Sequence, residues 1–422
     1  MKNRNLRLYL SGQAISLIGT WMQITAQSWV VWQLSKSEAA LGLVGMMGSL
    51  PLLVLGPIAG VWADRLDRRK ILINTQTVAM ILAMILAVLV QFHWVQLWHV
   101  YILAFTLGCV SALDMPSQQA FIGDMVGMEQ IRKAVVVNSM IVQVSRILGP
   151  TLAGLVVQAI GAAPAFWLNG LSFVAVIVSL FAVRANQVHR PAQDQGKGNF
   201  REGVRFALGQ PRVLDLMLLT ALITCFGFSN SQILPAFADR VLHGDAGLYG
   251  SMMGASGIGA LISVLFIVPL GQRVKRTGLM LVAAVTLAGL SFAATSFSHA
   301  AWTAMLAYFF SGLPIPLVMT TNGGLIQVLA PGQMRARLVT LYLMLSFGLQ
   351  PVANLWVGFL AEKVGPALAI RINGFSMFAV AVLMLLRSGL STWEPAAHRA
   401  QGAPQGAPPN GNVAPAAEGR PS

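Results

Sequence analysis

Charged residues and cysteine are both scarce in this sequence. Only 10% of the 422 residues are charged, whereas 56% are hydrophobic. A soluble protein of this length needs a more polar surface, so we expect lipid to be its main solvent. The two cysteines, Cys109 and Cys225, lie in separate apolar runs, which argues against a disulfide framework.

Several signatures of enzymes and metalloproteins are missing. No G-x-x-x-x-G-K sequence occurs, so the chain offers no nucleotide-binding loop for ATP-driven transport. The six histidines have no metal-ligand spacing, and the acidic residues are scattered rather than gathered near one membrane interface. We therefore expect no metal site, no cofactor and no enzyme activity. An integral-membrane lipid-modifying enzyme is the alternative from another functional class.

Acidic residues are also few: 14 Asp and Glu stand against 28 Lys and Arg, which gives a net charge of +14. Such a charge could indicate nucleic-acid binding, but the basic residues lie in short clusters between apolar runs and form no single patch. This arrangement is typical of a membrane protein, whose basic loops stay on the cytoplasmic side. We expect no nucleic-acid partner.

The apolar runs are long enough to cross a lipid bilayer as helices. We predict an all-α integral membrane protein with twelve spans, at about residues 8–34, 40–63, 71–91, 96–117, 134–160, 163–183, 213–238, 247–270, 278–297, 300–328, 338–361 and 366–387. The first run follows a basic N-terminus but has no small-residue cleavage site, so we interpret it as an uncleaved helix.

The basic residues orient these spans. With a cytoplasmic N-terminus, 23 of the 28 Lys and Arg lie inside and four lie at the outer ends. The four outer residues are Lys36, Arg240, Lys363 and Arg371, and the remaining one, Arg146, lies within a span. The expected location is the bacterial inner (cytoplasmic) membrane, with both termini in the cytoplasm.

One short polar stretch, G-V-W-A-D-R-L-D-R-R-K, runs from Gly60 to Lys70 between the second and third spans. Gly60 would allow close helix packing, and Asp64 could accept hydrogen bonds or pair with an Arg. The pattern G-x-x-x-D-R-x-x-R-R at this place resembles the signature loop of the major facilitator superfamily. Asp67 stands where that family usually has Gly. The alternative interpretation is a stop-transfer charge cluster.

We predict that this loop is a conformational latch. It would hold the two halves of the protein together on the cytoplasmic side when the cavity faces outward, through charged bonds that break in the other state. Its residues are Gly60, Asp64, Arg65, Asp67, Arg68 and Arg69.

The two halves of the chain repeat each other. Gly154, Gly161, Asn169 and Gly170 recur 204 residues later as Gly358, Gly365, Asn373 and Gly374. Two six-helix halves with the substrate site between them are the architecture of this transporter fold. The expected division is an N-terminal bundle (1–183), a cytoplasmic central loop with an amphipathic helix (184–212), a C-terminal bundle (213–387) and a disordered tail (388–422).

Polar side chains inside the spans mark a candidate substrate cavity. The candidates are Gln13, Ser16, Thr20, Gln23 and Gln27 in the first span, Thr220, Thr224 and Ser231 in the seventh, and Gln350 and Asn354 in the eleventh. By resemblance, the first, fourth, seventh and tenth spans line the cavity. Hydrogen bonding between helices is the alternative. Pro314 and Pro316 predict a break or kink in the tenth span, as a gate or as a simple packing irregularity.

Arg146 lies about 18 Å along the fifth span, near the bilayer midplane. We predict that it interacts with Asp114, which lies nearer the cytoplasm in the fourth span, and that the pair couples proton movement to transport. A guanidinium does not readily lose its proton, so a carboxylate would carry it. Asp215 in the seventh span is the next candidate carrier. A structural ion pair is the alternative.

Just beyond Arg146, the residues G-P-T-L-A-G resemble the antiporter motif G-P-x-x-G-G of helix five in the superfamily, with Ala153 replacing one Gly. The matching positions are Gly149, Pro150 and Gly154. In the family this motif accompanies efflux. The stretch L-D-M-P-S-Q-Q-A after Ala112 also looks like the end of helix four in the branch of bacterial enterobactin and macrolide exporters. The resemblance extends to about Arg387.

These features together predict a secondary active transporter. The expected activity is proton-coupled export of a small organic molecule, such as a drug, siderophore or metabolite, by alternating access in a monomer. An uptake permease or facilitator of the same fold is the alternative, and the direction of transport in everted vesicles would distinguish the two.

Overall fold

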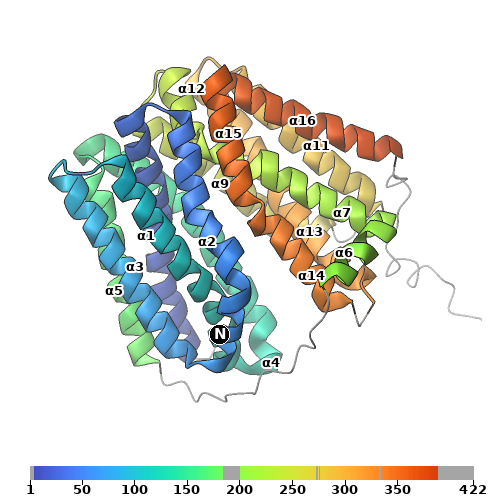
Figure 1. Cartoon of the computed structure of the whole chain (residues 1–422), viewed down its shortest axis with the longest axis horizontal. Coiled ribbons are helices and arrows are strands. Elements are labelled where there is room, and N and C mark those ends of the chain that lie inside the picture. Colours follow the sequence, from blue (N-terminus) through green and yellow to red (C-terminus); the bar gives the residue numbers. More distant parts are fainter. Residues whose placement is uncertain (1–3, 184–199, 272–273, 275, 332–333, 388–422) are drawn as a thin grey trace, which may run out of the picture.

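The computed structural model describes residues 4–183, 200–271, 274, 276–331 and 334–387, and every regular element in these ranges is a helix (Figure 1). The expected tail (388–422) and most of the expected central loop (184–199) lie outside the described residues. The N-terminal half consists of α1 (Arg4–Ser35), α2 (Glu38–Arg65), α3 (Arg68–Gln91), α4 (Leu97–Ile160) and α5 (Ala163–Ala182).

The helices of the C-terminal half are interrupted more often. They are α6 (Phe200–Gly209), α7 (Pro211–Leu222), η1 (Ile223–Gly227), η2 (Phe228–Gln232), α8 (Leu234–Arg240), α9 (Ala246–Ile262), η3 (Ser263–Ile267), α10 (Val268–Gly271), α11 (Thr277–Ser296), α12 (Ala301–Gly312), α13 (Pro314–Leu329), α14 (Arg335–Leu343), η4 (Met344–Gly348), α15 (Gln350–Val364) and α16 (Pro366–Arg387). The segments η1, η3 and η4 are π-helical turns, and η2 is a 3₁₀ turn. Sequence analysis did not foresee these π-helical and 3₁₀ turns.

Local chemistry sets several helix boundaries. The Ser37 hydroxyl accepts a hydrogen bond from the Ala40 amide and caps α2. Asp67 caps α3 by accepting from the amides of Arg69 (3.0 Å) and Lys70 (3.3 Å). Gly161, with φ of 90°, ends α4 in a conformation that favours glycine. The Asp67 cap therefore supplies the local turn that the usual family Gly would otherwise provide.

Eleven helical stretches among the described residues are long and apolar enough to cross a membrane. Helix α1 is the twelfth predicted span: its 32 residues would extend about 48 Å. Its polar stripe lowers its hydropathy, and several of those side chains are buried against the rest of the bundle, as with Gln13 and Gln23. The prediction of a twelve-span, all-helical protein thus agrees with the helices that the structure contains.

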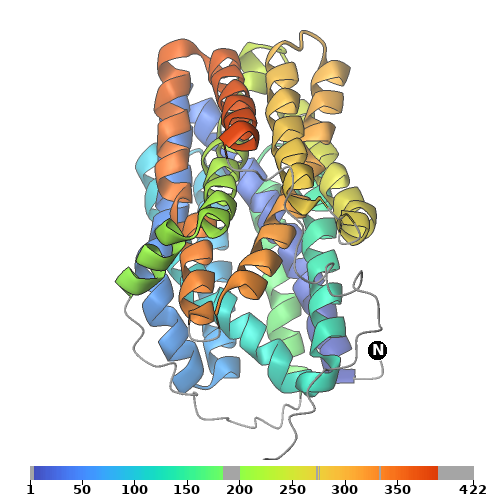
Figure 2. The ribbon, with the colours of Figure 1, turned by 90° about the vertical axis from the view of Figure 1, so that its right-hand side faces the viewer.

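Helix α4 differs from the prediction, which placed two separate spans at 96–117 and 134–160. It is continuous over 64 residues, a length of about 96 Å if straight and too long for a single crossing. Gln118 contacts Gln13 and Arg146 contacts Trp21. The α4 positions would lie about 42 Å apart along a straight helix, but the α1 positions lie only about 12 Å apart. Helix α4 therefore bends back on itself (Figure 2), and its two arms serve as the fourth and fifth spans.

Two bundles are visible in Figure 1, α1–α5 (the N-terminal bundle) and α7–α16 (the C-terminal bundle). We call the end of the molecule with the turn between α1 and α2 the Lys36 end, and the opposite end, with the turn between α2 and α3, the Arg68 end. The bundles meet at the Lys36 end, at the top of Figure 1, and diverge toward the Arg68 end.

Glycine pairs bring the two bundles into close contact. A Cβ on Gly154 of α4 would lie 3.1 Å from the Gly250 Cα of α9. The contact between α15 and α2 is similar, because a Cβ on Gly358 would lie 2.7 Å from the Gly42 Cα. Gly154 and Gly358 are partners in the sequence repeat, so the repeat places equivalent helix crossings on both sides of the molecule.

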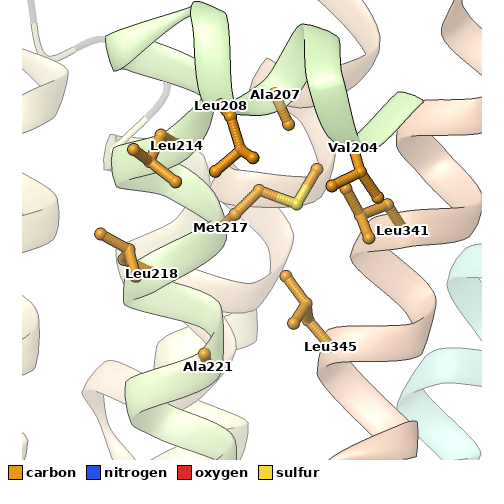
Figure 3. Close-up of a pocket in the computed structure, with 9 residues that line it drawn as sticks. All are labelled: Val204, Ala207, Leu208, Leu214, Met217, Leu218, Ala221, Leu341 and Leu345. Carbon is orange, nitrogen blue, oxygen red and sulfur yellow. The ribbon is translucent and has the colours of Figure 1, made fainter. Parts of the chain in front are cut away.

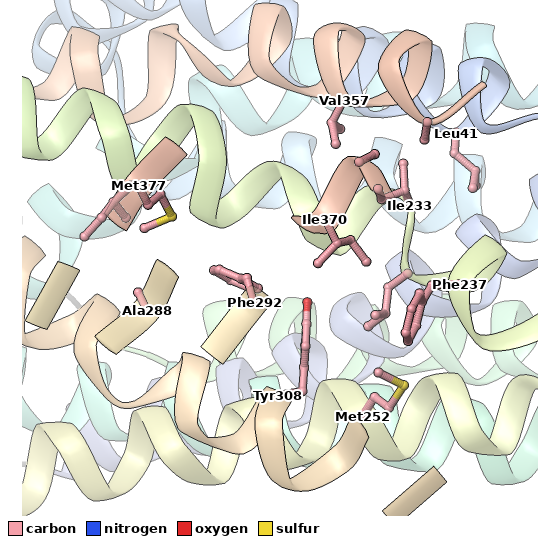
Figure 4. Close-up of a cluster of buried hydrophobic side chains, with 14 of the residues drawn as sticks. Leu41, Ile233, Phe237, Met252, Ala288, Phe292, Tyr308, Val357, Ile370 and Met377 are labelled. Atoms are coloured by element: carbon pink, nitrogen blue, oxygen red, sulfur yellow. The ribbon is translucent and has the colours of Figure 1, made fainter. Parts of the chain in front are cut away.

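A hydrophobic core continues around these crossings. Figure 4 shows buried side chains from several helices, including Leu41 on α2, Phe237 on α8, Met252 on α9 and Val357 on α15. Phe292 and Tyr308 pack edge to face, with ring centroids 6.0 Å apart. Because one buried cluster draws on both bundles, the Lys36 end is held by packing as well as by polar contacts.

Candidate functional site

A buried carboxylate lies in the N-terminal bundle. Asp114 of α4 is 9% exposed. Its Oδ1 accepts hydrogen bonds from Thr75 Oγ1 (2.7 Å) and Gln76 Nε2 (3.0 Å) of α3, and its Oδ2 accepts from Gln118 Nε2 (2.5 Å). All three donors are neutral. Within the described residues, no Lys or Arg forms an ion pair with Asp114.

This cluster reaches α1 and contains oxygen atoms without partners. Gln13 Nε2 donates to Gln118 Oε1 (3.2 Å). Among the described residues, no hydrogen-bond partner meets the buried Tyr9 Oη, Gln13 Oε1 or Gln76 Oε1. Tyr9 itself is fixed against Phe121, with ring centroids 5.4 Å apart. A carboxylate surrounded by neutral donors and spare oxygen atoms can bind a proton or a small cation.

Arg146 is placed apart from Asp114, so the predicted contact between them is not made in this conformation. Its guanidinium lies over the Trp21 ring, 5.1 Å from the centroid. The reason is depth, since Asp114 is level with Gln118 and Gln13 whereas Arg146 is level with Trp21. Asp215, the second candidate carrier, is buried in α7 of the other bundle. The structure thus brings together none of the three proposed coupling residues.

The motif around Pro150 packs α4 between two other helices. A Cβ on Gly149 would lie 2.4 Å from the Trp21 Cβ and 2.9 Å from the Ile18 carbonyl oxygen. On the other side, a Cβ on Gly250 would lie 2.4 Å from the Pro150 carbonyl oxygen and 2.8 Å from the Gly154 Cα. The motif residues therefore let α4 approach α1 and α9 closely.

The predicted polar stripe of α1 divides into different roles. Gln23, 4% exposed, accepts a hydrogen bond of 2.6 Å from Asn169 Nδ2 of α5. Asn373, the repeat partner of Asn169, donates to Asn230 Oδ1 at 2.7 Å in the other bundle. In this conformation Gln23 joins helices, which was the alternative to a cavity role. Ser16 is also buried, and Thr20 donates to its carbonyl; Gln27 is partly exposed.

The C-terminal candidates are mostly engaged with backbone. Thr220 and Thr224 are fully buried; Thr220 Oγ1 accepts from Asn322 Nδ2 (3.1 Å) and Thr224 Oγ1 donates to the Ser346 carbonyl (3.4 Å). Ser231 donates to the Phe228 carbonyl. The other two candidates are Gln350, which is partly exposed, and Asn354, which is buried beside Gly45.

The predicted latch is described in part. Arg68 Nη1 lies 2.7 and 2.8 Å from the two carboxylate oxygens of Asp124 in α4. Arg69 donates to the carbonyls of Leu180 (2.8 Å) and Phe181 (3.0 Å) at the end of α5. These bonds lie within the N-terminal bundle. The surroundings of Gly60 and the side chains of Asp64 and Arg65 lie outside what the structure describes.

A polar network that sequence analysis missed joins the bundles at the Lys36 end. Lys36 Nζ and Trp32 Nε1 both donate to Asp239 Oδ2, each at 2.8 Å. Arg240 Nη1 donates to Glu38 Oε1 at 2.7 Å, and Glu38 is 1% exposed. The sequence does place charges of opposite sign at the ends of these spans. Sequence analysis used only the basic residues among them, and only to orient the spans.

Further contacts extend this network, which we call the Lys36-end network. The Arg240 guanidinium lies 4.8 Å from the centroid of the Trp32 ring and donates to the Lys36 carbonyl. Glu362 Oε2 of α15 accepts from the Ser37 hydroxyl (2.9 Å) and the Ala39 amide (3.0 Å) of the other bundle. Both α8 and α15 are therefore fastened to the turn between α1 and α2.

The charges of this network shift the acidity of Asp239. Burial raises the pKa of this carboxyl, but hydrogen bonds from Lys36 and Trp32 outweigh burial, and the nearby positive charges act in the same direction. Its pKa therefore lies below the ordinary value of 3.8. Asp239 is ionised, and the contact is formed, at any pH above that ordinary value.

The tenth span breaks where its prolines predicted a kink. Helix α12 ends at Gly312 and α13 begins at Pro314. A proline at this position cannot donate the backbone hydrogen bond that would continue the helix. A Cβ on Gly312 would lie 2.0 Å from the Ser256 carbonyl oxygen of α9, so the break also coincides with a close helix contact.

The amphipathic helix of the central loop is present as α6. Its apolar side chains Val204, Ala207 and Leu208 line a cavity of 180 Å³ together with residues of α7 and α14, as Figure 3 shows. Arg337 of α14 forms an ion pair with Glu202 of α6. Helix α6 therefore packs on the C-terminal bundle at the Arg68 end.

Comparison with known proteins agrees with this architecture. The transmembrane secretion effector family, a family of major facilitator transporters, matches residues 2–410. An MFS-type transporter of Bacillus subtilis, YfiS, is 27% identical over 400 residues, which cover 91% of this chain and 93% of the relative. The staphyloferrin A transporter of Staphylococcus aureus is 21% identical and covers 89% and 94%. The multidrug efflux pump Tap of Mycolicibacterium fortuitum is 23% identical and covers 86% and 91%.

Solved structures show the same fold. A peptide transporter of the POT family superimposes with a TM-score of 0.73 at 15% identity, over 93% of this chain and 96% of that chain. The nucleoside transporter NupG gives a TM-score of 0.68 at 14% identity, over 93% and 100%. These are transporters rather than enzymes. Because the family profile covers nearly the whole chain, the protein belongs to the transmembrane secretion effector family of the major facilitator superfamily.

Proposed function

We propose that this protein exports small organic molecules across the bacterial inner membrane in exchange for protons. The observation that supports coupling is Asp114, a buried carboxylate held by three neutral donors and by no described cation. Burial favours the protonated carboxyl and the three hydrogen bonds favour the ionised form, so small movements of α3 or α4 would change which form is stable. The export direction follows the relatives named for multidrug efflux.

The predicted orientation gives these elements their place in a transport cycle. With the basic loops inside, the Arg68 end faces the cytoplasm and the Lys36 end faces outward. The Lys36-end network and the glycine crossings hold the bundles together on the outer side. This conformation is then the inward-facing state, in which substrate is loaded from the cytoplasm.

In the outward-facing state the signature loop would close the cytoplasmic side. Arg68 and Arg69 are already fixed within the N-terminal bundle through Asp124 and the end of α5. Such anchoring would present Asp64 and Arg65 to the C-terminal bundle as a preformed surface. The two bundles, expected at residues 1–183 and 213–387, would then move relative to each other, and the central loop (184–212) would link them.

Transport in everted vesicles tests this function. A respiratory proton gradient should drive uptake of a fluorescent probe set into vesicles that contain the protein, and an uncoupler should abolish it. Three pyrene probes with the same butyl linker, ending in a carboxylate, an amide or an ammonium, serve as substrates. Asp114→Asn should abolish gradient-driven uptake. Asp245→Asn is the matched control, because Asp245 is exposed and an asparagine can still cap α9 and accept the hydrogen bond from Gln158.

Two results would overturn the proposal. Uptake that survives the uncoupler unchanged would exclude proton coupling, and uptake driven instead by a sodium gradient would make the spare oxygens around Asp114 a cation site. Accumulation only in right-side-out vesicles would favour the uptake permease.

A further inference from the structure

The surroundings of Arg146 differ from those of Arg68, Arg69 and Arg240. Arg68 and Arg240 bind carboxylates, and Arg69 binds backbone carbonyls. The Arg146 guanidinium lies over the Trp21 ring, with its Cζ 5.1 Å from the centroid, and no described residue accepts a hydrogen bond from it. A guanidinium carries five N–H donors in one plane, and a ring on one side of it accepts none of them in a conventional hydrogen bond, so these donors can bind an anion.

The Arg146 side chain is not sealed inside the protein. Arg146 lies at the depth of Trp21, and its side chain is only partly buried. Its nitrogen atoms are not among the sealed polar atoms that lack a partner. Both facts hold when a side chain lines an internal space. A charge at this depth is costly unless an opposite charge meets it.

Arg146 lies where the two bundles meet. Its carbonyl oxygen is 3.2 Å from the position of a Cβ on Gly257 of α9, and its charge lies close enough to Tyr308 of α12 to interact with it. Both residues belong to the C-terminal bundle. An anion bound here would touch elements that separate and rejoin during alternating access.

We propose that Arg146 binds an anionic group, such as a carboxylate, on the transported molecule. Trp21 lies beside the guanidinium and offers a flat apolar surface for the rest of that molecule. Gly149 makes this possible, because any larger side chain there would push Trp21 away. The inference rests on the proposed transport function and adds a substrate class to it: amphipathic molecules with an acidic group.

The pyrene probe set tests this assignment by direct binding. The purified protein in nanodiscs is titrated with each probe, and energy transfer from tryptophan to pyrene reports binding. Because a charge-assisted hydrogen bond strengthens binding by about tenfold or more, the carboxylate should bind at least about tenfold more tightly than the amide. Arg146→Gln should remove that preference, and Arg146→Lys should keep part of it, since an ammonium retains the charge but not the planar fork.

A matched control comes from the other bundle. Arg371 also lies over an aromatic ring, 3.8 Å from the centroid of Phe297, but it donates to Ser296. Arg371→Gln should leave the preference for the carboxylate unchanged. Each variant is first checked for a wild-type melting temperature, and Arg146→Lys serves as the test if Arg146→Gln does not fold.

The outcomes separate the two proposals. Equal binding of carboxylate and amide, no binding of the carboxylate, or a preference that persists in Arg146→Gln would each overturn the role of Arg146. If everted vesicles still take up the amide or ammonium probe, the proposed transport function stands without the anion site at Arg146. If no probe is exported although the carboxylate binds through Arg146, the anion site stands and the transport proposal fails.

Discussion

At the scale of single residues, the buried polar groups have unequal surroundings. Asp114 is surrounded by neutral hydrogen-bond donors, Arg146 lies on an aromatic ring, and Gln23 is bonded to Asn169. The bond between Gln23 and Asn169 joins two helices, as structural glue does. Asp114 and Arg146 instead keep capacity for a proton or a ligand, which is why they stand in the two proposals.

Gly149 provides a residue-scale test of how closely α1 and α4 must approach. Gly149→Ala places a methyl group 2.4 Å from the Trp21 Cβ, so the helices must separate. Such overpacking costs about 1–3 kcal/mol. We expect a lower melting temperature in detergent and weaker binding of the pyrene carboxylate. Gly48→Ala is the control, because nothing lies within 4 Å of its Cβ position. Equal melting temperatures for both variants would contradict the close approach.

At the scale of elements, the C-terminal bundle is the more irregular one. Three of its spans contain π-helical turns, and Thr224 of η1 donates to Ser346 of η4, so two of these turns touch. Turns of this kind are frequent at functional sites. The tenth span is divided into α12 and α13 as well. The described N-terminal helices contain no comparable π turn, so we expect bending to concentrate in the C-terminal bundle.

The break between α12 and α13 can be tested at Pro314. Pro314→Ala restores a backbone N–H and favours a continuous helix by up to about 3 kcal/mol. If the break is a gate, the variant should transport more slowly without loss of melting temperature. Pro366→Ala is the control, since Pro366 opens α16, where proline is tolerated. Unchanged transport in Pro314→Ala would support a packing irregularity instead.

The signature loop is a second test at this scale. Arg68→Asp should reduce transport, because it breaks the ion pair with Asp124 and places two carboxylates together. The double change Arg68→Asp with Asp124→Arg should recover transport in vesicles if the pair anchors the loop. Recovery of membrane insertion but not of transport would mean that Arg68 has another partner in the outward-facing state.

At the scale of the whole molecule, the Lys36-end network fastens the two bundles to each other at one end. Its two ion pairs are unequal, because Lys36 is exposed and Asp239 is partly exposed, whereas Glu38 is buried. An exposed pair contributes about 0.2–1 kcal/mol. Removal of Arg240 leaves Glu38 buried without its cation, which costs about 3–5 kcal/mol.

Arg240→Gln should therefore open the Lys36 end far more than Lys36→Gln. Spin labels at Ala162 and Ala301, on opposite bundles, would report this as a longer distance in double electron–electron resonance. The Asp239 contact contributes above pH 3.8, and it weakens as the pH falls below that value, because the pKa of the folded protein is lowered. Equal distances in both variants would show that packing alone closes this end.

The sequence by itself determined the helical spans, the family and the repeat, because each of these depends on local hydropathy, on charge near the spans or on a contiguous motif. It also located the break at Pro314 and the amphipathic α6, for the same reason. The partners of Asp114 and of Arg68 were not foreseen, because Thr75, Gln76 and Asp124 come from other helices and their registers depend on packing.

Only the tertiary structure decided how deep the charged groups lie relative to one another. Asp114 and Arg146 are 32 residues apart on α4, and the bend of that helix sets each one against a different part of α1. Hydropathy does not encode this bend, because the residues between the two arms stay helical. The same holds for the Lys36-end network, where helix ends more than 200 residues apart in the sequence meet only after the bundles have packed together.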